Sequence, residues 1–180
     1  MQVVKGLDPI QYMGRWYEIA ALPSLFQPKN SINTRATYTL NPCGIVHVCN
    51  ETWSYGKRDC IQGVAYKADP KSNEAKFKVK FYEPPFLPII PVVGNYWVLY
   101  LDDDYQYVMI GEPDRRYLWI LSRHNRMDDE IYNMLVKKAK EEGYDVRRLK
   151  KTTHTDPPPG LGDAPTDTKG LWWILAIFGK

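Results

Sequence analysis

The sequence predicts a mostly β protein, an eight-stranded antiparallel up-and-down barrel with one C-terminal α-helix packed on it. Short β-prone segments follow one another along most of the chain, separated by turn residues. Gly14 and Trp16 open the first of these segments, Arg123 follows the last, and a single helical pattern comes after it. Eight strands are enough to close a barrel around one small ligand.

The first strand begins with Gly14-Arg15-Trp16-Tyr17. A glycine lets the backbone turn sharply into a strand, and the tryptophan after it can plug the end of a closed sheet. Arg123, laid over that indole, would add a cation–π contact and spare donors for nearby carbonyls. For the tetrapeptide alone, the alternative is that Trp16 is an ordinary core residue. Taken together, the segment at Trp16 and the strand that ends before Arg123 fit the closing strands of a barrel.

Alternation and turn chemistry define the other strands. The pattern is clearest at 76–81, where Phe77, Val79 and Phe81 face one side while three lysines face water. Asn41-Pro42-Cys43-Gly44 is a strong turn signal after the second strand. The predicted strands are residues 16–22, 34–40, 45–53, 60–68, 76–81, 96–101, 107–111 and 117–122.

The predicted helix covers residues 128–142. Ile131, Leu135 and Ala139 recur at four-residue spacing and form an apolar face that should pack against the barrel wall. An aspartate, Asp128 or Asp129, can cap its start, and Gly143 ends it.

Composition divides the chain into three parts. Residues 1–150 form the barrel and its helix. Residues 151–170 are rich in Pro, Gly, Thr and Asp and cannot bury enough apolar area to order themselves. Residues 171–180 form an apolar tail, too short to span a bilayer, in which Trp172 and Trp173 beside flanking lysines favour an interfacial anchor. Docking of this tail in a groove of its own barrel is the alternative.

Charge and cysteine content limit the functions. The net charge is +3, which is too small to indicate nucleic-acid binding. Six Trp and thirteen Tyr suit an apolar pocket or a membrane interface. The first residues contain no apolar stretch typical of a signal peptide, and three clustered cysteines suit a reducing compartment. We therefore expect a cytoplasmic protein or one at the cytosolic side of a membrane.

Strand alternation also predicts a cavity lined by aromatic and apolar side chains. Such a cavity would suit a fatty acyl chain, an isoprenoid or a tetrapyrrole. The alternative is that these side chains simply fill the barrel. The candidates are Ala36, Tyr38, Phe77, Val79, Phe81, Tyr117 and Trp119.

An uncharged segment, residues 84–93, joins two of the strands. Its four prolines forbid a regular helix or a central strand, so we expect a loop. An apolar loop of this length must contact something, either the barrel mouth as a lid or, as we favour, a membrane surface. The tail would be a second anchor, and two weak anchors hold better than one. The predicted membrane contacts are Pro85, Phe86, Leu87, Ile89, Ile90, Trp172 and Trp173.

The residues do not form a recognisable catalytic or metal-binding motif. His47, His124 and His154 stand apart, and the aspartates 102–104 lack the remaining ligands of a calcium loop. A haem with His47 or a tyrosine as axial ligand is possible, but no spacing requires it. We expect a non-catalytic binder without cofactor or metal. A lipid-modifying isomerase or a thiol-dependent peroxide scavenger, using Cys49 or Cys60, is the alternative.

Taken together, these motifs resemble the lipocalin family. The matching positions are Gly14, Trp16 and Tyr17 in its first motif and Arg123 in its third, while Asp103 best fits the second, which here lacks its threonine. The resemblance covers about residues 7–149. It is nearest to the intracellular plant branch, the temperature-induced lipocalins, where it extends to Lys180, and it is similar to bacterial outer-membrane lipocalin and apolipoprotein D.

The resemblance implies more than the residues do by themselves. It implies a calyx that binds small hydrophobic molecules at its centre. It also implies association with the plasma membrane and protection of lipids during heat, cold and oxidative stress.

Overall fold

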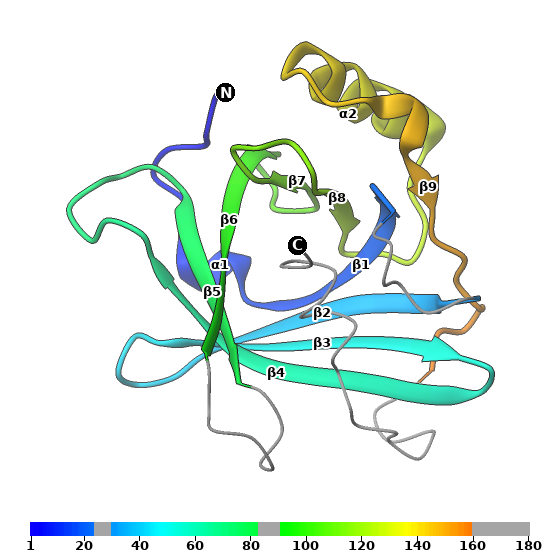
Figure 1. The fold of residues 1–180 in the computed structure, drawn as a ribbon, viewed down its shortest axis with the longest axis horizontal. Coiled ribbons are helices and arrows are strands. Elements are labelled where there is room, and N and C mark those ends of the chain that lie inside the picture. The colour runs from blue at the N-terminus through cyan, green and yellow to red at the C-terminus, as the bar shows by residue number, and fades with distance from the viewer. Residues whose placement is uncertain (24–29, 83–90, 160–180) are drawn as a thin grey trace.

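Eight strands in up-and-down order close the barrel (Figure 1). The computed structural model describes residues 1–23, 30–82 and 91–159, except for the side chains of 82, 91 and 92. The sheet order is β2-β3-β4-β5-β6-β7-β8-β1-β9, and β1 also pairs with β2, which completes the ring. The strands are β1 Gly14–Ala21, β2 Ile32–Leu40, β3 Val46–Ser54, β4 Lys57–Lys67, β5 Lys76–Tyr82, β6 Pro91–Leu101, β7 Tyr107–Gly111, β8 Leu118–Ser122 and β9 Lys150–Lys151. The helices are α1 Pro9–Tyr12, α2 Asp129–Glu141 and the 3₁₀ turn Val146–Arg148.

The predicted fold class is confirmed, and the predicted strands differ from the observed ones mainly at their ends. The largest difference is at β6, which begins at Pro91 rather than Tyr96, so the prediction that residues 91–93 belong to a loop is wrong. Pro91 pairs with Tyr82 as the first residue of its strand, a position where a missing N–H is tolerated. Both α1 and β9 are too short to produce a periodic pattern, and the sequence did not predict them.

Helix α2 lies outside the barrel, over β7 and β8 (Figure 1). Leu135 and Ala139 on its predicted apolar face are fully buried. They belong to a cluster with Leu118 and Ile120, which point outward from β8. A second apolar cluster lies on the inside of the barrel. Strands β7 and β8 therefore lie between two apolar layers, one inside the barrel and one under α2.

Trp16 and Arg123 shut the end of the barrel where β1 begins. The Trp16 side chain is fully buried, and the guanidinium carbon of Arg123 lies 3.9 Å from its ring centroid. The indole Nε1 donates to the carbonyl of Tyr12 in α1. The three guanidinium nitrogens of Arg123 donate to the carbonyls of Gln11, Arg15 and Tyr105. The arginine therefore ties together the N-terminal segment, β1 and the turn between β6 and β7.

Gly14 and an aspartate complete this end. Gly14 has a φ of +97°, and a Cβ there would lie 3.2 Å from Nη1 of Arg123, so a side chain would be both strained and crowded. In the β6–β7 turn, the Asp102 carboxylate accepts hydrogen bonds from the amides of Gln106 and Tyr107. Sequence comparison with the family motif favoured Asp103, but Asp102 makes these turn contacts. Tyr17 points outward, edge-on to His154.

Residues 150–159, which we call the strap, run along the split between β1 and β2. These two strands pair only over Gly14–Tyr17. Beyond that point β9 pairs with β1, and the amide of Asn33 in β2 donates to the carbonyl of Thr153. The linker predicted from residue 151 thus lies against the barrel as far as residue 159, and residues 160–170 are outside the described part.

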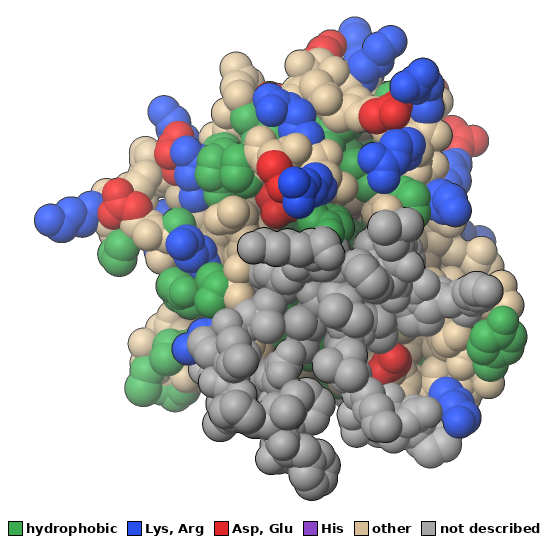
Figure 2. Space-filling model, viewed as in Figure 1, with side chains coloured by type: hydrophobic (Ala, Val, Ile, Leu, Met, Phe, Trp, Pro, Cys, Tyr) green, Lys and Arg blue, Asp and Glu red, His purple; other side chains and the backbone are tan. Residues whose placement is uncertain are grey.

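The surface carries charges of both signs. Basic and acidic side chains are interspersed on the face shown in Figure 2, in keeping with the net charge of +3. Among residues 1–23, 30–82 and 91–159, no helix has the length and apolar character needed to cross a membrane.

Candidate ligand-binding site

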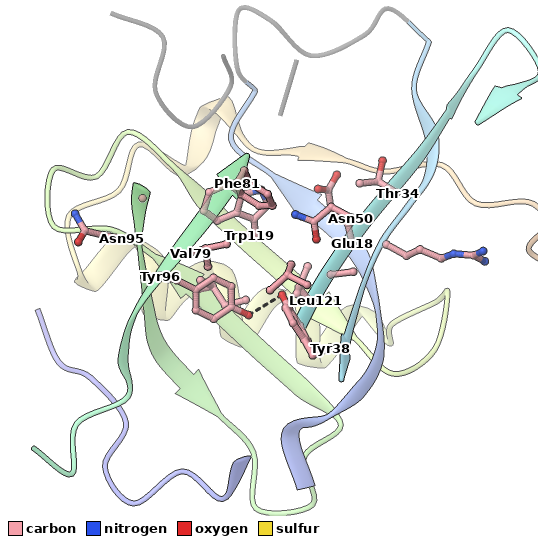
Figure 3. A pocket seen from close by; sticks show the side chains of 15 residues that line it. Glu18, Thr34, Tyr38, Asn50, Val79, Phe81, Asn95, Tyr96, Trp119 and Leu121 are labelled. Carbon is pink, nitrogen blue, oxygen red and sulfur yellow. Dashed lines mark hydrogen bonds between the residues drawn. The ribbon is translucent and has the colours of Figure 1, made fainter. Parts of the chain in front are cut away.

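Residues from seven strands line the main cavity of the barrel. Its volume is about 560 Å³ with the open mouth included. Phe81, Val79 and Trp119 contribute apolar and aromatic surface, and Figure 3 shows them gathered about the cavity. The lining residues are Glu18, Thr34, Arg35, Ala36, Tyr38, Val48, Asn50, Val79, Phe81, Gly94, Asn95, Tyr96, Ile110, Trp119 and Leu121.

Five of the seven predicted ligand-binding residues line this cavity: Ala36, Tyr38, Val79, Phe81 and Trp119. The other two lie elsewhere. Phe77 lines a second, smaller cavity near α1, and Tyr117 stacks on the ring of Trp119 at a centroid distance of 5.9 Å. Tyr117 precedes the first residue of β8, so it lacks the fixed inward direction that the strand gives Trp119.

Three tyrosines form the boundary between the two cavities. The hydroxyl of Tyr96 lies 2.6 Å from that of Tyr12. It also lies 2.9 Å from the hydroxyl of Tyr38, a bond drawn as a dashed line in Figure 3. Burial raises the pKa of Tyr38 to about 12 and raises the pKa of Tyr12 and Tyr96 as well, so all three hydroxyls stay protonated. This chain of hydroxyls satisfies its own hydrogen bonds and leaves ring surface toward the main cavity.

A polar wall faces the apolar side of the main cavity. Thr34, Asn50 and Glu18 are all more than nine-tenths buried there. The Thr34 hydroxyl is bonded to that of Thr52 at 2.7 Å. No hydrogen bond joins the side-chain amide of Asn50 to another residue of the described part of the chain, and Asn50 lines the cavity, so its donor and acceptor can bind a ligand there.

Glu18 is the titratable group of this wall. Its Oε1 accepts a hydrogen bond of 2.5 Å from Thr152 of the strap, and its backbone carbonyl accepts one from Nε2 of His154. Burial raises the pKa of Glu18 from 4.5 to about 7, and the bond from Thr152 only partly opposes this. Near neutral pH, a large fraction of this carboxyl is therefore uncharged, which suits an apolar cavity.

Replacing Glu18 with glutamine is expected to raise the free energy of unfolding at pH 8 by on the order of 3 kcal/mol. The folded-state pKa lies above the unfolded one, so the wild type loses stability as the pH rises from about 4.5 to about 7. Glutamine does not ionise, so the variant does not lose this part of its stability. Chemical denaturation of both proteins at pH 4 and pH 8 measures the difference in the free energy of unfolding.

The control is Glu112, whose pKa burial also raises, to about 8, with help from Asp114. Glu112 remains in the variant, so a shallower loss of stability with pH should persist. Equal stability of the wild type and Glu18→Gln at pH 8 would show that Glu18 ionises in the folded protein without cost.

The structure brings no metal site together from the described residues, and it does not describe the predicted membrane contacts. The predicted contacts Pro85, Phe86, Leu87, Ile89, Ile90, Trp172 and Trp173 lie outside the described residues. Within residues 1–23, 30–82 and 91–159, no three His, Cys, Asp or Glu side chains come together in a way that could hold a metal ion. Of the three histidines in the sequence, His154 bonds the backbone carbonyl of Glu18 in β1. Burial lowers the pKa of His154.

The polar wall and Tyr96 were not predicted as site residues. Tyr96 begins a predicted strand, residues 96–101, whose two faces are both apolar or aromatic, so alternation alone could not show that Tyr96 faces the cavity. Asn50 and Thr52 stand at inward positions of β3 after Val46 and Val48. These polar residues at inward positions were the sequence signal for the polar wall, because a barrel interior packed only for stability is expected to be apolar.

A family model and a relative of high identity name the family of this chain. A lipocalin-like domain model matches residues 7–154. The chain is 66% identical over 180 residues to temperature-induced lipocalin-1 of Arabidopsis thaliana, covering all of this chain and 97% of that one. It is 34% identical over 149 residues to outer membrane lipoprotein Blc of Escherichia coli K12, covering 82% and 79%.

More distant proteins share the fold. The chain is 32% identical to apolipoprotein D of Macaca fascicularis over 163 residues, covering 87% and 82%. Insecticyanin of Manduca sexta superposes with a TM-score of 0.71 at 20% identity, over 93% of this chain and 90% of that one. With its closed barrel, its single flanking helix and these matches, the chain belongs to the lipocalin family.

Proposed function

We propose that the protein binds and carries one small, largely hydrophobic molecule in the main cavity without catalysing a reaction on it. The observation that carries the proposal is the apolar inner face of the barrel, which Phe81, Val79 and Trp119 line. Apolar walls with a few placed polar groups are typical of small-molecule sites. Lipids, fatty acids, isoprenoids and tetrapyrroles are the candidate classes.

The polar wall favours a ligand with one polar end. The free amide of Asn50 would bond a hydroxyl or carboxyl group, while Phe81 and Val79 would contact the hydrocarbon part. An uncharged Glu18 beside it favours a neutral polar group over a fixed anion. An alkane would leave the Asn50 amide unsatisfied.

Changing Asn50 to leucine is therefore expected to weaken binding of a long-chain alcohol about three- to tenfold, since a typical hydrogen bond contributes about 0.5–1.5 kcal/mol. Affinity for the matching alkane should stay the same or rise. Displacement of a fluorescent apolar probe measures both. If the alcohol and the alkane change equally, Asn50 does not select the polar end.

We also propose peripheral membrane association. The supporting observations are the uncharged composition of residues 84–93 and the paired tryptophans of the tail. Strand β5 ends at Tyr82 and β6 begins at Pro91, so the segment between them joins the barrel at the end opposite Trp16. A relative, Blc, is named an outer membrane lipoprotein. We place the association at the cytosolic face of the plasma membrane.

In a liposome flotation assay, the triple variant Phe86→Asp, Ile89→Asp, Trp172→Asp is expected to stay in the soluble fraction while the wild type floats. Each carboxylate would have to enter the headgroup region, which opposes insertion. Ile10→Asp is the matched control, because Ile10 is 73% exposed in α1 at the closed end. Flotation of the triple variant to the same extent as the wild type would contradict the anchoring proposal.

We further propose that the bound molecule is a membrane lipid or its damage product, removed during heat, cold or oxidative stress. The name of the Arabidopsis relative, temperature-induced lipocalin-1, supports the link to temperature. A cavity at the membrane surface would take up a single lipid-derived molecule and hold it apart from the bilayer.

A further inference from the structure

Two cysteines meet on the outer face of the β3–β4 hairpin. Tyr55 and Gly56 form a two-residue turn with φ values of 51° and 75°, the backbone that tight hairpins favour. This turn sets the register, so Cys49 lies opposite Gln62 and Cys60 lies opposite Glu51. Cys49 and Cys60 are thus diagonal neighbours on one face, with their Sγ atoms 3.3 Å apart.

Both thiols are free and partly exposed. A disulfide needs an S–S distance of about 2.05 Å, so small movements of the two side chains and strands would join them. Diagonal positions on a hairpin are farther apart than directly opposed ones. The bond would therefore draw the strands together, and bonds of that kind are the ones that thiols reduce readily.

The surroundings make the two thiols unequal. Arg58 lies on the same hairpin, and its Nε and Nη2 bond Oε1 of Glu51 at 2.7 and 2.6 Å. The hydrogen bond from Cys49 and the charge of Arg58 lower the pKa of Cys60 despite burial and the nearby carboxylates. The pKa of Cys49 is raised, chiefly because its proton is shared with Cys60. Cys60 is therefore the more acidic thiol of the pair and the better candidate for the attacking sulfur.

We propose that Cys49 and Cys60 are a redox-active pair that a hydroperoxide converts into a reversible disulfide. The Cys60 thiolate attacks the outer oxygen of the hydroperoxide and the O–O bond breaks. The alkoxide takes up from solvent the proton that Cys60 released on ionising, and it leaves as an alcohol. The Cys60 sulfenic acid formed is then attacked by the sulfur of Cys49. The S–S bond forms, and the hydroxide released combines with the proton of Cys49 to give water.

The overall change oxidises two thiols by two electrons and reduces one hydroperoxide to one alcohol and one water. A small thiol such as glutathione restores the pair by thiol–disulfide exchange, which forms its own disulfide. The pair lies on the outer face, whereas Val48 and Asn50 of the same strand face the cavity. The inference therefore does not depend on ligand binding inside the barrel.

Cys43 is the internal control. It is exposed in the turn between β2 and β3, at the other end of β3 from the hairpin turn, and it cannot reach Cys60 within one chain.

The test uses the full-length protein, reduced and then freed of reductant, with one equivalent of cumene hydroperoxide. We expect the intact mass to fall by two hydrogen atoms and the maleimide-reactive thiols to fall from three to one. Peptide mapping should find Cys49 joined to Cys60, cumyl alcohol should form in equal amount, and glutathione should reverse the change. Failure of the wild type to form this disulfide, or a disulfide through Cys43, would overturn the proposal.

Variants test the assignment of roles. Cys49→Ser should stop at a Cys60 sulfenic acid that dimedone traps, whereas Cys60→Ser should react slowly and Cys43→Ser should behave as the wild type. Arg58→Gln should slow the oxidation several-fold. Faster oxidation of Cys49 in Cys60→Ser than of Cys60 in Cys49→Ser would overturn the assignment of Cys60 as the attacking thiolate.

Discussion

Replacing Trp16 with alanine is expected to lower the free energy of unfolding by about 3–5 kcal/mol, the usual cost of removing a large, fully buried aromatic side chain. The indole is 0% exposed, and it contacts the ring of Tyr12 at a centroid distance of 5.1 Å. Alanine would also leave the Arg123 guanidinium, 3.9 Å above the ring, without its aromatic surface. Chemical denaturation followed by far-ultraviolet circular dichroism measures the change.

Tyr66→Ala provides the comparison, because Tyr66 points outward from β4 and is 43% exposed. The free energy of unfolding of Tyr66→Ala should stay within about 0.5 kcal/mol of the wild-type value. The double variant Trp16→Ala, Arg123→Ala should lose less than the sum of the two single losses, since the partners contact each other. A loss below about 1 kcal/mol in Trp16→Ala, or strict additivity with Arg123→Ala, would mean that this pair does not close the barrel as a unit.

Replacing Ala36 with tryptophan is expected to weaken ligand binding nearly a hundredfold. Ala36 points into the main cavity from β2, and its small side chain leaves space there. An indole in that space would displace about 100 Å² of ligand contact, and at about 25 cal/mol per Å² the loss is about 2.5 kcal/mol. Titration with a fluorescent fatty-acid analogue measures the dissociation constant.

Thr39→Trp is the matched control, because Thr39 lies on the same strand but is exposed on the outer face. It adds the same ring without entering the cavity, so binding should match that of the wild type. Overpacking in Ala36→Trp should cost about 1–3 kcal/mol of stability, and circular dichroism shows whether the barrel persists. A folded Ala36→Trp protein with unchanged affinity would place the ligand outside the main cavity.

Much of the fold could be predicted from the sequence because strand alternation and turn residues are local signals. Phe77, Val79 and Phe81 alternate with lysines, so the inner face of β5 is readable without any tertiary information. The ends of the elements were less predictable. Pro91 disfavours a strand in general, yet it is accommodated at the first position of β6, where its partner is fixed by the hairpin and not by the local sequence.

The polar side of the cavity depends on contacts between distant segments. Glu18 is buried because Thr152, 134 positions along the chain, lies against it through the strap. Neither residue carries a local sign of that contact. A threonine and a histidine after a helix suggest an exposed linker, and only the split between β1 and β2 gives them a place to bond.

The cysteine pair lies between these two cases. Cys49 and Cys60 are eleven positions apart, and their strands were predicted as residues 45–53 and 60–68 with a turn between them. The two cysteines lie on the same face because the turn has two residues, Tyr55 and Gly56. A turn longer or shorter by one residue would shift the register and place the two cysteines on opposite faces. The hairpin could be predicted from the sequence, but the pairing register that brings the two cysteines together is known only from the structure.

Photo-crosslinking with a fatty acid that carries a diazirine near its end locates the ligand most directly. If the barrel interior is the binding site, the labelled residues of the wild type are inward ones of β5 and β8, such as Val79, Phe81 and Trp119. The label should be lost in Ala36→Trp and kept in Thr39→Trp. Label confined to outward residues, or equal labelling of the wild type and Ala36→Trp, would contradict binding inside the barrel.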